Sequence, residues 1–338
     1  MTEPPIEPKA SPASYADFGG VPKAGVMATL VQFFAIPLLI TCVAVGIFVG
    51  VKTLVGNEPT TALDFVEMLK GDTVNRRWQA AFEVSARVRK AAVQNGGVFT
   101  VPEEFRDPRL IRALEEALAK ARRDEDPRPA QHLLLTLALI GDPASLATVR
   151  SALEDTSPIL RSYALLALGR FRDHGSSERM LAMARDTDAG TRQAALLALA
   201  LLDQAPGEPE GGRLILSSKT RELALELLGD RSEDVRFQAA IILGRARERE
   251  AALPVLKTML DRERLGKIEF DRAGSGMDQY AVQGNLILHT LDTLVLLDAG
   301  DDPEVLALVQ KRADTDHEGD PEVRQRARAA LARWKKAP

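Results

Sequence analysis

The sequence predicts an all-α protein: an α-solenoid of about seven helical hairpins, preceded by one transmembrane helix. Of its 338 residues 45% are apolar but only 5% are aromatic, which suits helices packed through small and aliphatic side chains. Residues 24–51 carry no charge, and a pattern of charged and small residues recurs through the rest of the chain. The net charge of −4 argues against a nucleic-acid-binding protein, which usually has a basic surface.

The first two segments are a tail and an apolar run. Residues 1–23 are rich in proline and lack periodicity, so a disordered tail is expected. Residues 24–55 are expected to form the transmembrane helix, because about 20 apolar residues suffice to cross the hydrocarbon core. A cleaved signal peptide would have a basic start and a shorter apolar stretch. Gly46 and Gly50 have the GxxxG spacing that allows close helix approach, so a homodimer through them is one interpretation and a chance spacing is the other.

The orientation of this helix is set only weakly by its flanking charges. Two lysines lie within about 20 residues of each end, so the positive-inside rule does not decide. A group of basic residues from Arg76 to Lys90 favours a cytoplasmic solenoid. We therefore expect a single-pass protein of a bacterial inner membrane, with the solenoid in the cytoplasm.

The repeated pattern is seen in "DRSEDVRFQAAIILGRA", which begins at Asp230. An acidic residue precedes an arginine by six positions, and small residues follow at helical spacing. The pattern occurs as Asp155 with Arg161, Asp186 with Arg192, Asp230 with Arg236 and Glu318 with Arg324. Looser copies surround Arg76 or Arg77, and Arg128. A catalytic pair such as Asp234 and Arg236 would be needed once, so recurrence favours a structural role.

Each copy follows a shorter stretch whose apolar residues recur at i, i+3, i+4 and i+7, as in a one-faced helix. The unit is therefore helix, short acidic turn, second helix and loop, and stacked units bury a continuous core. This pattern over residues 59–336 resembles the HEAT-repeat family, in the bacterial form also found in phycobilisome lyases. The resemblance implies that the acidic residues and arginines of neighbouring repeats form a buried ladder along the inner helices.

Two insertions interrupt the repeats, at residues 202–219 and 261–285. In the second, "KIEF" and "QYAV" flank "DRAGSGMD", a pattern that predicts a small hairpin with a flexible tip. Long loops are often functional, so partner contact and a solvated ornament are both open interpretations. The candidate contact residues are Lys267, Glu269, Phe270, Arg272 and Tyr280.

The sequence has no signature of catalysis. It has no Walker A loop, HExxH, GxSxG or dinucleotide fingerprint, so neither an enzyme nor a cofactor is expected. His132 and His289 lie among apolar residues and are read as core residues. The stretch from Asp314 to Gln325 partly fits an EF-hand, with Gln325 at the position of the bidentate glutamate, and also fits an ordinary repeat turn. The basic end, residues 321–338, suits either anionic lipid or the polar face of a capping repeat.

The function that these observations favour is a membrane-anchored scaffold. A protein partner would be held on the concave solenoid face and by the 261–285 insertion, through many weak contacts. One alternative is a bilin-lyase-like protein that handles a chromophore. Another is a DNA-repair solenoid, which the acidic balance disfavours.

Overall fold

The computed structural model describes residues 36–54, 61, 64–71, 73–94, 101–205, 212–268 and 278–336. The chain divides into two compact units, Met1–Thr60 and Thr61–Pro338. Regular structure in the described residues is helical throughout, without a strand, as the composition predicts. The predicted tail at 1–23 lies outside the described residues.

In the first unit the described structure is the single helix α2 (Ile36–Leu54). Its large apolar side chains between Leu38 and Val49 are 53–69% exposed. An alanine Cβ at Gly46 or Gly50 would meet no atom within 4 Å. Among the described residues, no helix combines the length and the apolar character that crossing a membrane would require. The first twelve residues of the predicted span, 24–35, lie outside the described part.

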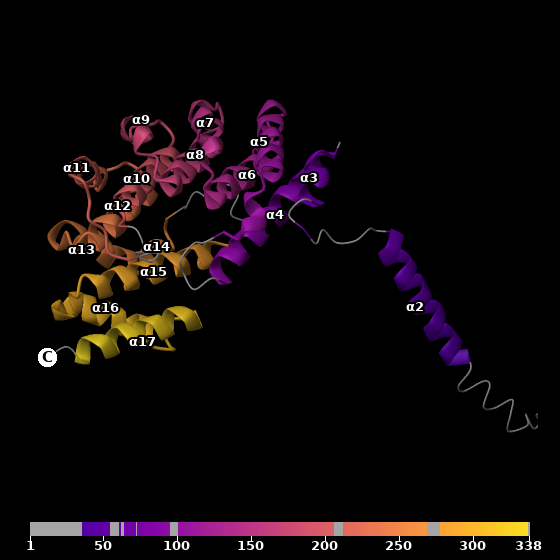
Figure 1. Ribbon diagram of the computed structural model, residues 1–338. Coiled ribbons are helices and arrows are strands. Elements are labelled where there is room, and N and C mark those ends of the chain that lie inside the picture. Colours follow the sequence, from indigo (N-terminus) through magenta and orange to yellow (C-terminus); the bar gives the residue numbers. More distant parts are fainter. Residues whose placement is uncertain are drawn as a thin grey trace, which may run out of the picture. The chain divides into compact units, whose positions relative to one another are not determined.

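The second unit is a solenoid in which the described helices pair into seven hairpins (Figure 1). The first helices of the pairs are α3 (Asp64–Leu69), α5 (Pro108–Arg123), α7 (Leu146–Ser151), α9 (Ser177–Met183), α11 (Ser218–Leu227), α13 (Arg249–Met259) and α16 (Pro303–Ala313). The second helices are α4 (Val74–Gln94), α6 (Pro127–Ile140), α8 (Pro158–Phe171), α10 (Ala189–Asp203), α12 (Glu233–Arg245), α15 (Gln279–Leu296) and α17 (Pro321–Lys336). The short helix α14 (Arg262–Leu265) lies between α13 and α15.

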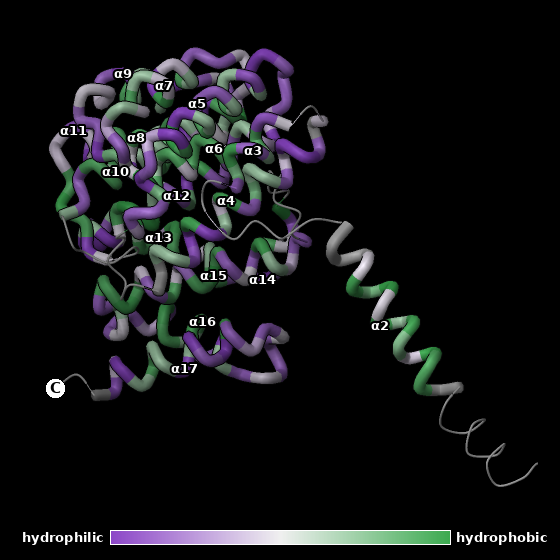
Figure 2. Tube along the Cα trace, turned by 45° about the vertical axis from the view of Figure 1, so that its right-hand side comes forward, coloured by the Kyte–Doolittle hydropathy of each residue, from purple (hydrophilic) through white to green (hydrophobic). Residues whose placement is uncertain are grey.

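Successive second helices pack directly on one another, from α4 to α17, and form the inner layer of the array. The first helices lie on the outer side of the curve (Figure 1). Apolar residues gather between the two layers, whereas the outer helices are mostly hydrophilic (Figure 2). The small residues that follow each repeat arginine are in this core: Ala164, Ala167, Ala195, Ala198, Ala239, Ala240, Ala327 and Ala330.

Helix starts follow local capping chemistry. Asp107, Asp126 and Asp302 each accept a hydrogen bond from a backbone N–H of the first turn and are followed by proline. A carboxylate cap satisfies a free N–H, and proline at the first helical position loses nothing by lacking one. The acidic turns of the repeat are therefore also the signals that begin the helices.

The prediction of a hairpin within residues 261–285 is wrong for its second strand, residues 279–282. Residues 279–282 form the first turn of α15, because the side chain of Asp278 accepts the N–H of Ala281 and starts the helix there. Residues 269–277, which include the predicted tip, lie outside the described residues. The part of the insertion that precedes them contains the short helix α14, which begins at the capping residue Asp261.

Candidate interaction groove

The repeat turn has a common hydrogen-bond pattern. In the turn at Asp186, the carboxylate accepts the N–H of Asp188, and Arg192 donates from Nη1 to the carbonyl of Asp186 at 2.9 Å. The same two contacts occur at Asp155 with Arg161 and at Asp230 with Arg236. An arginine six residues after the acidic residue can donate to the carbonyl of that residue. The turn geometry therefore explains why this spacing recurs.

Arg161 and Arg192 also reach the next repeat, whereas Arg236, predicted as a member of the same ladder, donates to Glu233 of its own helix. Arg192 donates to both carboxylate oxygens of Asp230, at 2.8 and 2.7 Å, and both side chains are less than a tenth exposed. Arg161 donates to Asp186 at 3.2 and 3.3 Å. Burial alone would raise the pKa of Asp230, but the hydrogen bonds from Arg192 and from the N–H of Ser232 hold it below its usual value. Neighbouring turns are thus joined by charge-assisted bonds.

Of the looser copies, the first is occupied by one of its two candidates and the second differs from the sequence-based assignment. Arg77 occupies the ladder position of the first repeat and donates to Asp124 at 2.8 Å, whereas Arg128 lies beside its own helix cap and pairs with Asp126. The second repeat has Ala130 six residues after Asp124. Arg122, from the first helix α5, donates to Asp155 in its place. The ladder is therefore continued by a different helix at this point.

The last predicted pair lies in a buried ionic cluster. The carboxylate of Glu318 has no solvent exposure and accepts bonds from Arg262 at 2.7 Å, Arg312 at 3.0 Å and the hydroxyl of Tyr280 at 3.1 Å. Arg324 donates to the carbonyl of Glu318, as in the other turns. Because its carboxylate oxygens are held by two arginines, Glu318 cannot serve a calcium ion, and the ordinary-turn interpretation of this stretch is the one that the structure favours.

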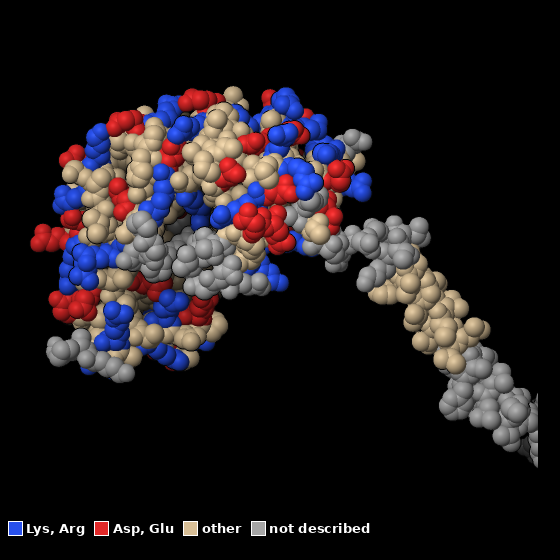
Figure 3. Space-filling view, in the orientation of Figure 1, with Lys and Arg blue, Asp and Glu red and all other residues tan. Residues whose placement is uncertain are grey.

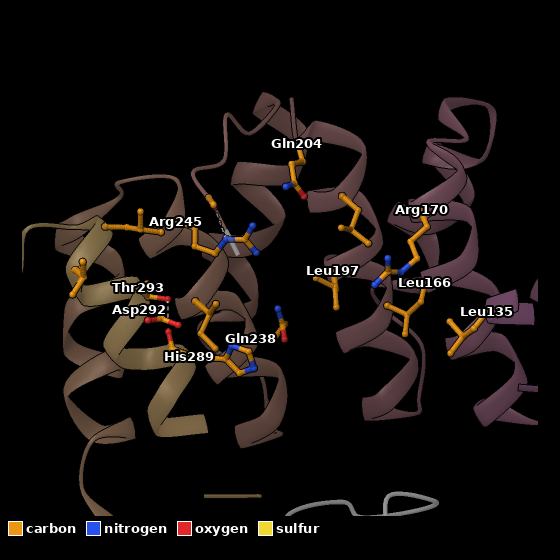
Figure 4. A pocket seen from close by; sticks show the side chains of 15 residues that line it. Leu135, Leu166, Arg170, Leu197, Gln204, Gln238, Arg245, His289, Asp292 and Thr293 are labelled. Atoms are coloured by element: carbon orange, nitrogen blue, oxygen red, sulfur yellow. Dashed lines mark hydrogen bonds between the residues drawn. The ribbon is translucent and has the colours of Figure 1, made fainter. Parts of the chain in front are cut away.

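The inner face of the solenoid forms a groove. Two cavities of about 750 and 500 Å³ adjoin there and share the residues Leu166, Leu197, Gln238, Ile241 and His289. Their helical lining residues come from second helices, α6 to α15. In Figure 4, Leu135, Leu166 and Leu197 follow one another on neighbouring helices along the cavity.

The repeat register explains which residues face this groove. Each of them lies eleven residues after the residue whose carbonyl or carboxylate opens the repeat turn. Counted from Gly71, Asp124, Asp155, Asp186 and Asp230 in turn, they are Phe82, Leu135, Leu166, Leu197 and Ile241. We call these five residues the apolar row. Four of them line the cavities, and Phe82 is 41% exposed beside the stacked ring of Trp78 and against His132. The row was not recognised from the sequence, although counting from the acidic residue would have revealed it.

The two edges of the groove differ in charge. Asp188 and Asp234 lie at the amino-terminal ends of α10 and α12. Arg170 and Arg245 lie at the carboxyl-terminal ends of α8 and α12, and both extend toward the cavity (Figure 4). Two carboxylates therefore lie toward one edge of the groove and two arginines toward the other, where Asp292 of α15, which pairs with Arg326, also lines the larger cavity. The charges also complement the helix dipoles.

The predicted contact residues of the second insertion fall into two groups. Tyr280 packs with its ring 4.0 Å from the guanidinium of Arg262 and its hydroxyl bonds Glu318, but the residue is 47% exposed, so it lies at the surface of the cluster. Lys267 is exposed and pairs with Glu263. Glu269, Phe270 and Arg272 lie outside the described residues.

The two expected core histidines lie at the groove instead of in the core. His289 is exposed and lines both cavities, while His132 is half-buried against Phe82. Burial lowers the pKa of His132, and the charge of Arg89 lowers it further.

Fold and groove together define an α-solenoid built of helical hairpins. Residues 111–200 match the family described as HEAT repeats, which agrees with the resemblance drawn from the repeat. A search of curated proteins finds no match for this sequence.

Among solved structures, 26 chains match. Human deoxyhypusine hydroxylase in complex with glycerol is 17% identical with a TM-score of 0.35, covering 82% of this chain and 96% of that one. The complex of CpcE and CpcF of phycocyanin lyase from Nostoc sp. PCC7120 is 13% identical with a TM-score of 0.44, covering 82% and 96%. A designed armadillo repeat protein is 13% identical with a TM-score of 0.33, covering 80% and 98%. We draw no conclusion about function from these likenesses.

Proposed function

We propose that the solenoid is a scaffold that binds a protein partner in its inner groove. The observation that carries this proposal is the apolar row, whose members remain partly accessible to solvent although they are large and apolar. A contiguous apolar surface of this kind on a folded protein marks an interaction site. Trp78 and Phe82, at 40% and 41% exposed, supply the aromatic side chains that dominate binding energy in protein interfaces.

The surface charge supports a protein partner over a polyanion. On the face seen in Figure 3, basic and acidic side chains are interspersed over the outer helices. Many of them form exposed ion pairs between neighbouring repeats, such as Arg179 with Glu154 and Arg185 with Glu226. A nucleic acid would require a continuous basic surface.

The proposal assigns no catalytic activity to the protein. Within the described ranges, no three or more His, Cys, Asp or Glu side chains are grouped so that they could hold a metal ion. The buried carboxylates of the turns accept hydrogen bonds from arginines and backbone N–H groups, and we propose that their role is structural. Lys267 and the other candidates of the 261–285 insertion are proposed as a second contact with the same partner.

We further propose that residues 24–55 attach the solenoid to a membrane, with the solenoid on the cytoplasmic side of a bacterial inner membrane. The support is the charge-free run of residues 24–51 and the exposed apolar side chains of α2. Gly46 and Gly50 lie on one face of α2, a spacing that suits a homodimer. Carbonate extraction of membranes tests the attachment: the full chain should stay in the pellet, and a chain that starts at residue 59 should be released.

A second candidate is a bilin-lyase-like protein that handles a chromophore. The observation that favours it is the cavity of about 750 Å³, which has an apolar floor and two arginines, Arg170 and Arg245, at one edge. A conjugated ligand with carboxylate groups would suit such a lining. Visible absorbance that persists through purification would support this candidate, and a colourless protein that fails to bind added bilin would remove it.

Photo-crosslinking tests the scaffold proposal directly. A photoreactive amino acid is placed at Leu197, in the groove, or at Leu225, a half-buried leucine of the outer helix α11. In native cells one partner should be captured in good yield from position 197 and not from position 225. Capture from neither position, or equally from both, would contradict binding in the groove.

A further inference from the structure

We propose that the occupant of the groove is a proline-rich segment of a partner protein, bound as a polyproline II helix along the axis of the solenoid. This inference rests on the proposed scaffold function and specifies the chemistry of the partner. The observations that carry it are a second row of side chains beside the apolar row, the hydrogen-bond donors that these side chains hold, and the spacing of the inner helices.

The second row follows from the register of the repeat. Each member lies three or four residues before a member of the apolar row, and residues at this spacing are neighbours on one helix face. Tyr163, Gln193 and Gln238 line the smaller cavity, while Trp78 and His132 lie against Phe82. We call these five residues the donor row, with one member from each of the helices α4, α6, α8, α10 and α12: Trp78, His132, Tyr163, Gln193 and Gln238.

Each member of the donor row has an N–H or O–H group that is left for a partner. Indole, imidazole, phenol and carboxamide groups can all donate a hydrogen bond. Within the described ranges, none of the five side chains is hydrogen-bonded to another residue, and all five are at least partly exposed. A partner that covers the row must supply acceptors, because a donor that is buried without one costs free energy.

The charged residues of the lining are already engaged within the solenoid. Asp188 caps α10. Arg245 donates to the carbonyl of Gly212, and Asp292 pairs with Arg326. The remaining charged residues of the two cavities also have interactions of their own. The polar groups that await a partner are therefore the uncharged ones of the donor row.

The spacing of the inner helices matches a polyproline II helix. This helix has three residues per turn and rises about 3.1 Å per residue, so the same face returns about every 9.3 Å. Packed α-helices lie about 8–10 Å apart, so one residue of each turn would meet one inner helix after another. A β-strand presents the same face about every 6.6 Å and would fall out of step with the repeats.

The backbone chemistry of such a segment fits the donor row. A polyproline II helix makes no internal hydrogen bonds, so its carbonyls are free to accept. Proline adds a carbonyl but no N–H, which suits a row in which every member can donate and Trp78 can only donate. An α-helix would use its carbonyls internally and leave the donors uncovered. Proline-rich segments also pack on aromatic surfaces, here supplied by Trp78, Phe82 and Tyr163.

The test uses the full-length protein and a dye-labelled peptide of five repeats of Leu-Pro-Pro, which places a leucine on every turn. One control repeats Leu-Gly-Gly, which keeps the leucine spacing in a flexible chain. A second repeats Leu-Ala-Ala, which favours an α-helix. We expect the Leu-Pro-Pro peptide to bind at least tenfold more tightly than either control, as measured by fluorescence anisotropy. Raising the salt concentration tenfold should change its affinity by less than about threefold, because no charge pair forms.

Protein variants locate the contact. Tyr163→Phe with Gln193→Met and Gln238→Met removes three donors while keeping the shapes of the side chains, and should weaken binding of the Leu-Pro-Pro peptide at least tenfold. Tyr163→Phe alone should weaken it about threefold or more. Gln310→Met, at an exposed position of the outer helix α16, is the matched control and should leave binding unchanged. Circular dichroism melting confirms that each variant is folded.

The remaining outcomes separate the proposals. Equal binding of either control peptide would overturn the polyproline II occupant, and undiminished binding by the triple variant would overturn the donor row. Tighter binding of a peptide with the chain's own proline-rich residues 1–23 would make this chain the occupant in place of a partner. If no peptide binds but position 197 still captures a partner, the proline-rich occupant is wrong and the scaffold function stands. If position 197 captures nothing either, both proposals fail.

Discussion

At the scale of single residues, Arg77, Arg161 and Arg192 each make two kinds of contact. Arg192 donates from Nη1 to carbonyls of its own turn and from Nε and Nη2 to Asp230 of the next repeat. The guanidinium is suited to this because its donors point in fixed directions, and a lysine could not make both contacts. The pair therefore fixes the relative position of two repeats as well as the shape of one turn.

The first prediction concerns this pair. Arg192→Ala leaves the carboxylate of Asp230 buried without its partner, and such a loss costs about 3–5 kcal/mol of stability. Arg179→Ala removes an ion pair of similar length, but its side chains are 48% and 67% exposed, so the loss should stay within about 1 kcal/mol. Urea denaturation measures both. Equal losses would show that the ladder does not bear on stability.

The second prediction concerns pH. Burial alone would raise the pKa of Glu318, but hydrogen bonds from Arg262 and from the N–H of Asp320, with the charges of Arg262 and Arg312, hold it below its usual value. A depressed pKa stabilises the fold at pH values above the unfolded pKa of about 4.3, and the contribution is lost as the pH falls through the folded pKa.

The free energy of unfolding of the native chain should therefore decrease as the pH falls from about 5 to 3. Glu318→Gln should be less stable at pH 7 and should show a flatter dependence over this range. Glu322→Gln, at the exposed start of α17, is the control. Identical pH profiles for the native chain and Glu318→Gln would rule out this role.

At the scale of elements, glycines set the distance between helices. A Cβ at Gly169 in α8 would lie 2.8 Å from the Cα and 3.0 Å from the carbonyl oxygen of Ala198 in α10. A Cβ at Gly244 in α12 would lie 2.4 Å from Thr293 Cγ2 in α15. At Gly169 the obstacle is backbone, which cannot rotate away, so the two helices would have to separate.

The third prediction follows from this close approach. Gly169→Ala should destabilise the fold by about 1–3 kcal/mol, as overpacking of a tight contact does. Gly229→Ala is the control, because its nearest neighbour is at 3.5 Å, an ordinary contact distance. Thermal melts of the two variants provide the comparison. If Gly169→Ala melts at the native temperature, the inner helices are not held at their closest approach.

The sequence predicted the helical hairpins, the spacing of six between acidic residue and arginine, and the close packing of the small residues. These features could be predicted because each copy of the repeat shows the same local pattern. It did not reveal Arg122, since this arginine lies on a first helix and meets Asp155 only through stacking. The start of α15 was placed too late because the capping residue Asp278 was assigned to a hairpin tip. The concave face was expected as the binding surface, but the apolar row on it was missed for the same reason as Arg122, because the row joins residues that are distant in the chain.

At the scale of the whole solenoid, each hairpin packs mainly on its neighbours, so stability is expected to vary along the array. The ladder joins the turns from Arg77 to Asp230. At the next turn Arg236 donates to Glu233 of its own helix, and the following connection is made by the Glu318 cluster. This places a boundary between α12 and the last hairpin.

The fourth prediction is a pattern of amide hydrogen exchange. Amides of α8, α10 and α12, which have repeats on both sides, should exchange most slowly. Amides of the first and last described hairpins, α3 with α4 and α16 with α17, should exchange faster, because each packs on one described hairpin only. Mass spectrometry of exchanged peptides measures this. Uniform protection along the solenoid would indicate a single cooperative unit without a boundary.

The hydrogen bond from one turn to the next has a consequence for how such a chain changes in length during evolution. Arg161 and Arg192 contact the acidic residue that opens the following turn, so the contact depends on order and not on identity. A gene that lost residues 186–229 would bring Asp230 to the place of Asp186 and leave Arg161 a matching carboxylate. If residues 155–185 were duplicated, Arg161 of the first copy would likewise meet the Asp155 of the second copy. The solenoid can therefore gain or lose whole modules without the compensating substitutions that a globular core would need.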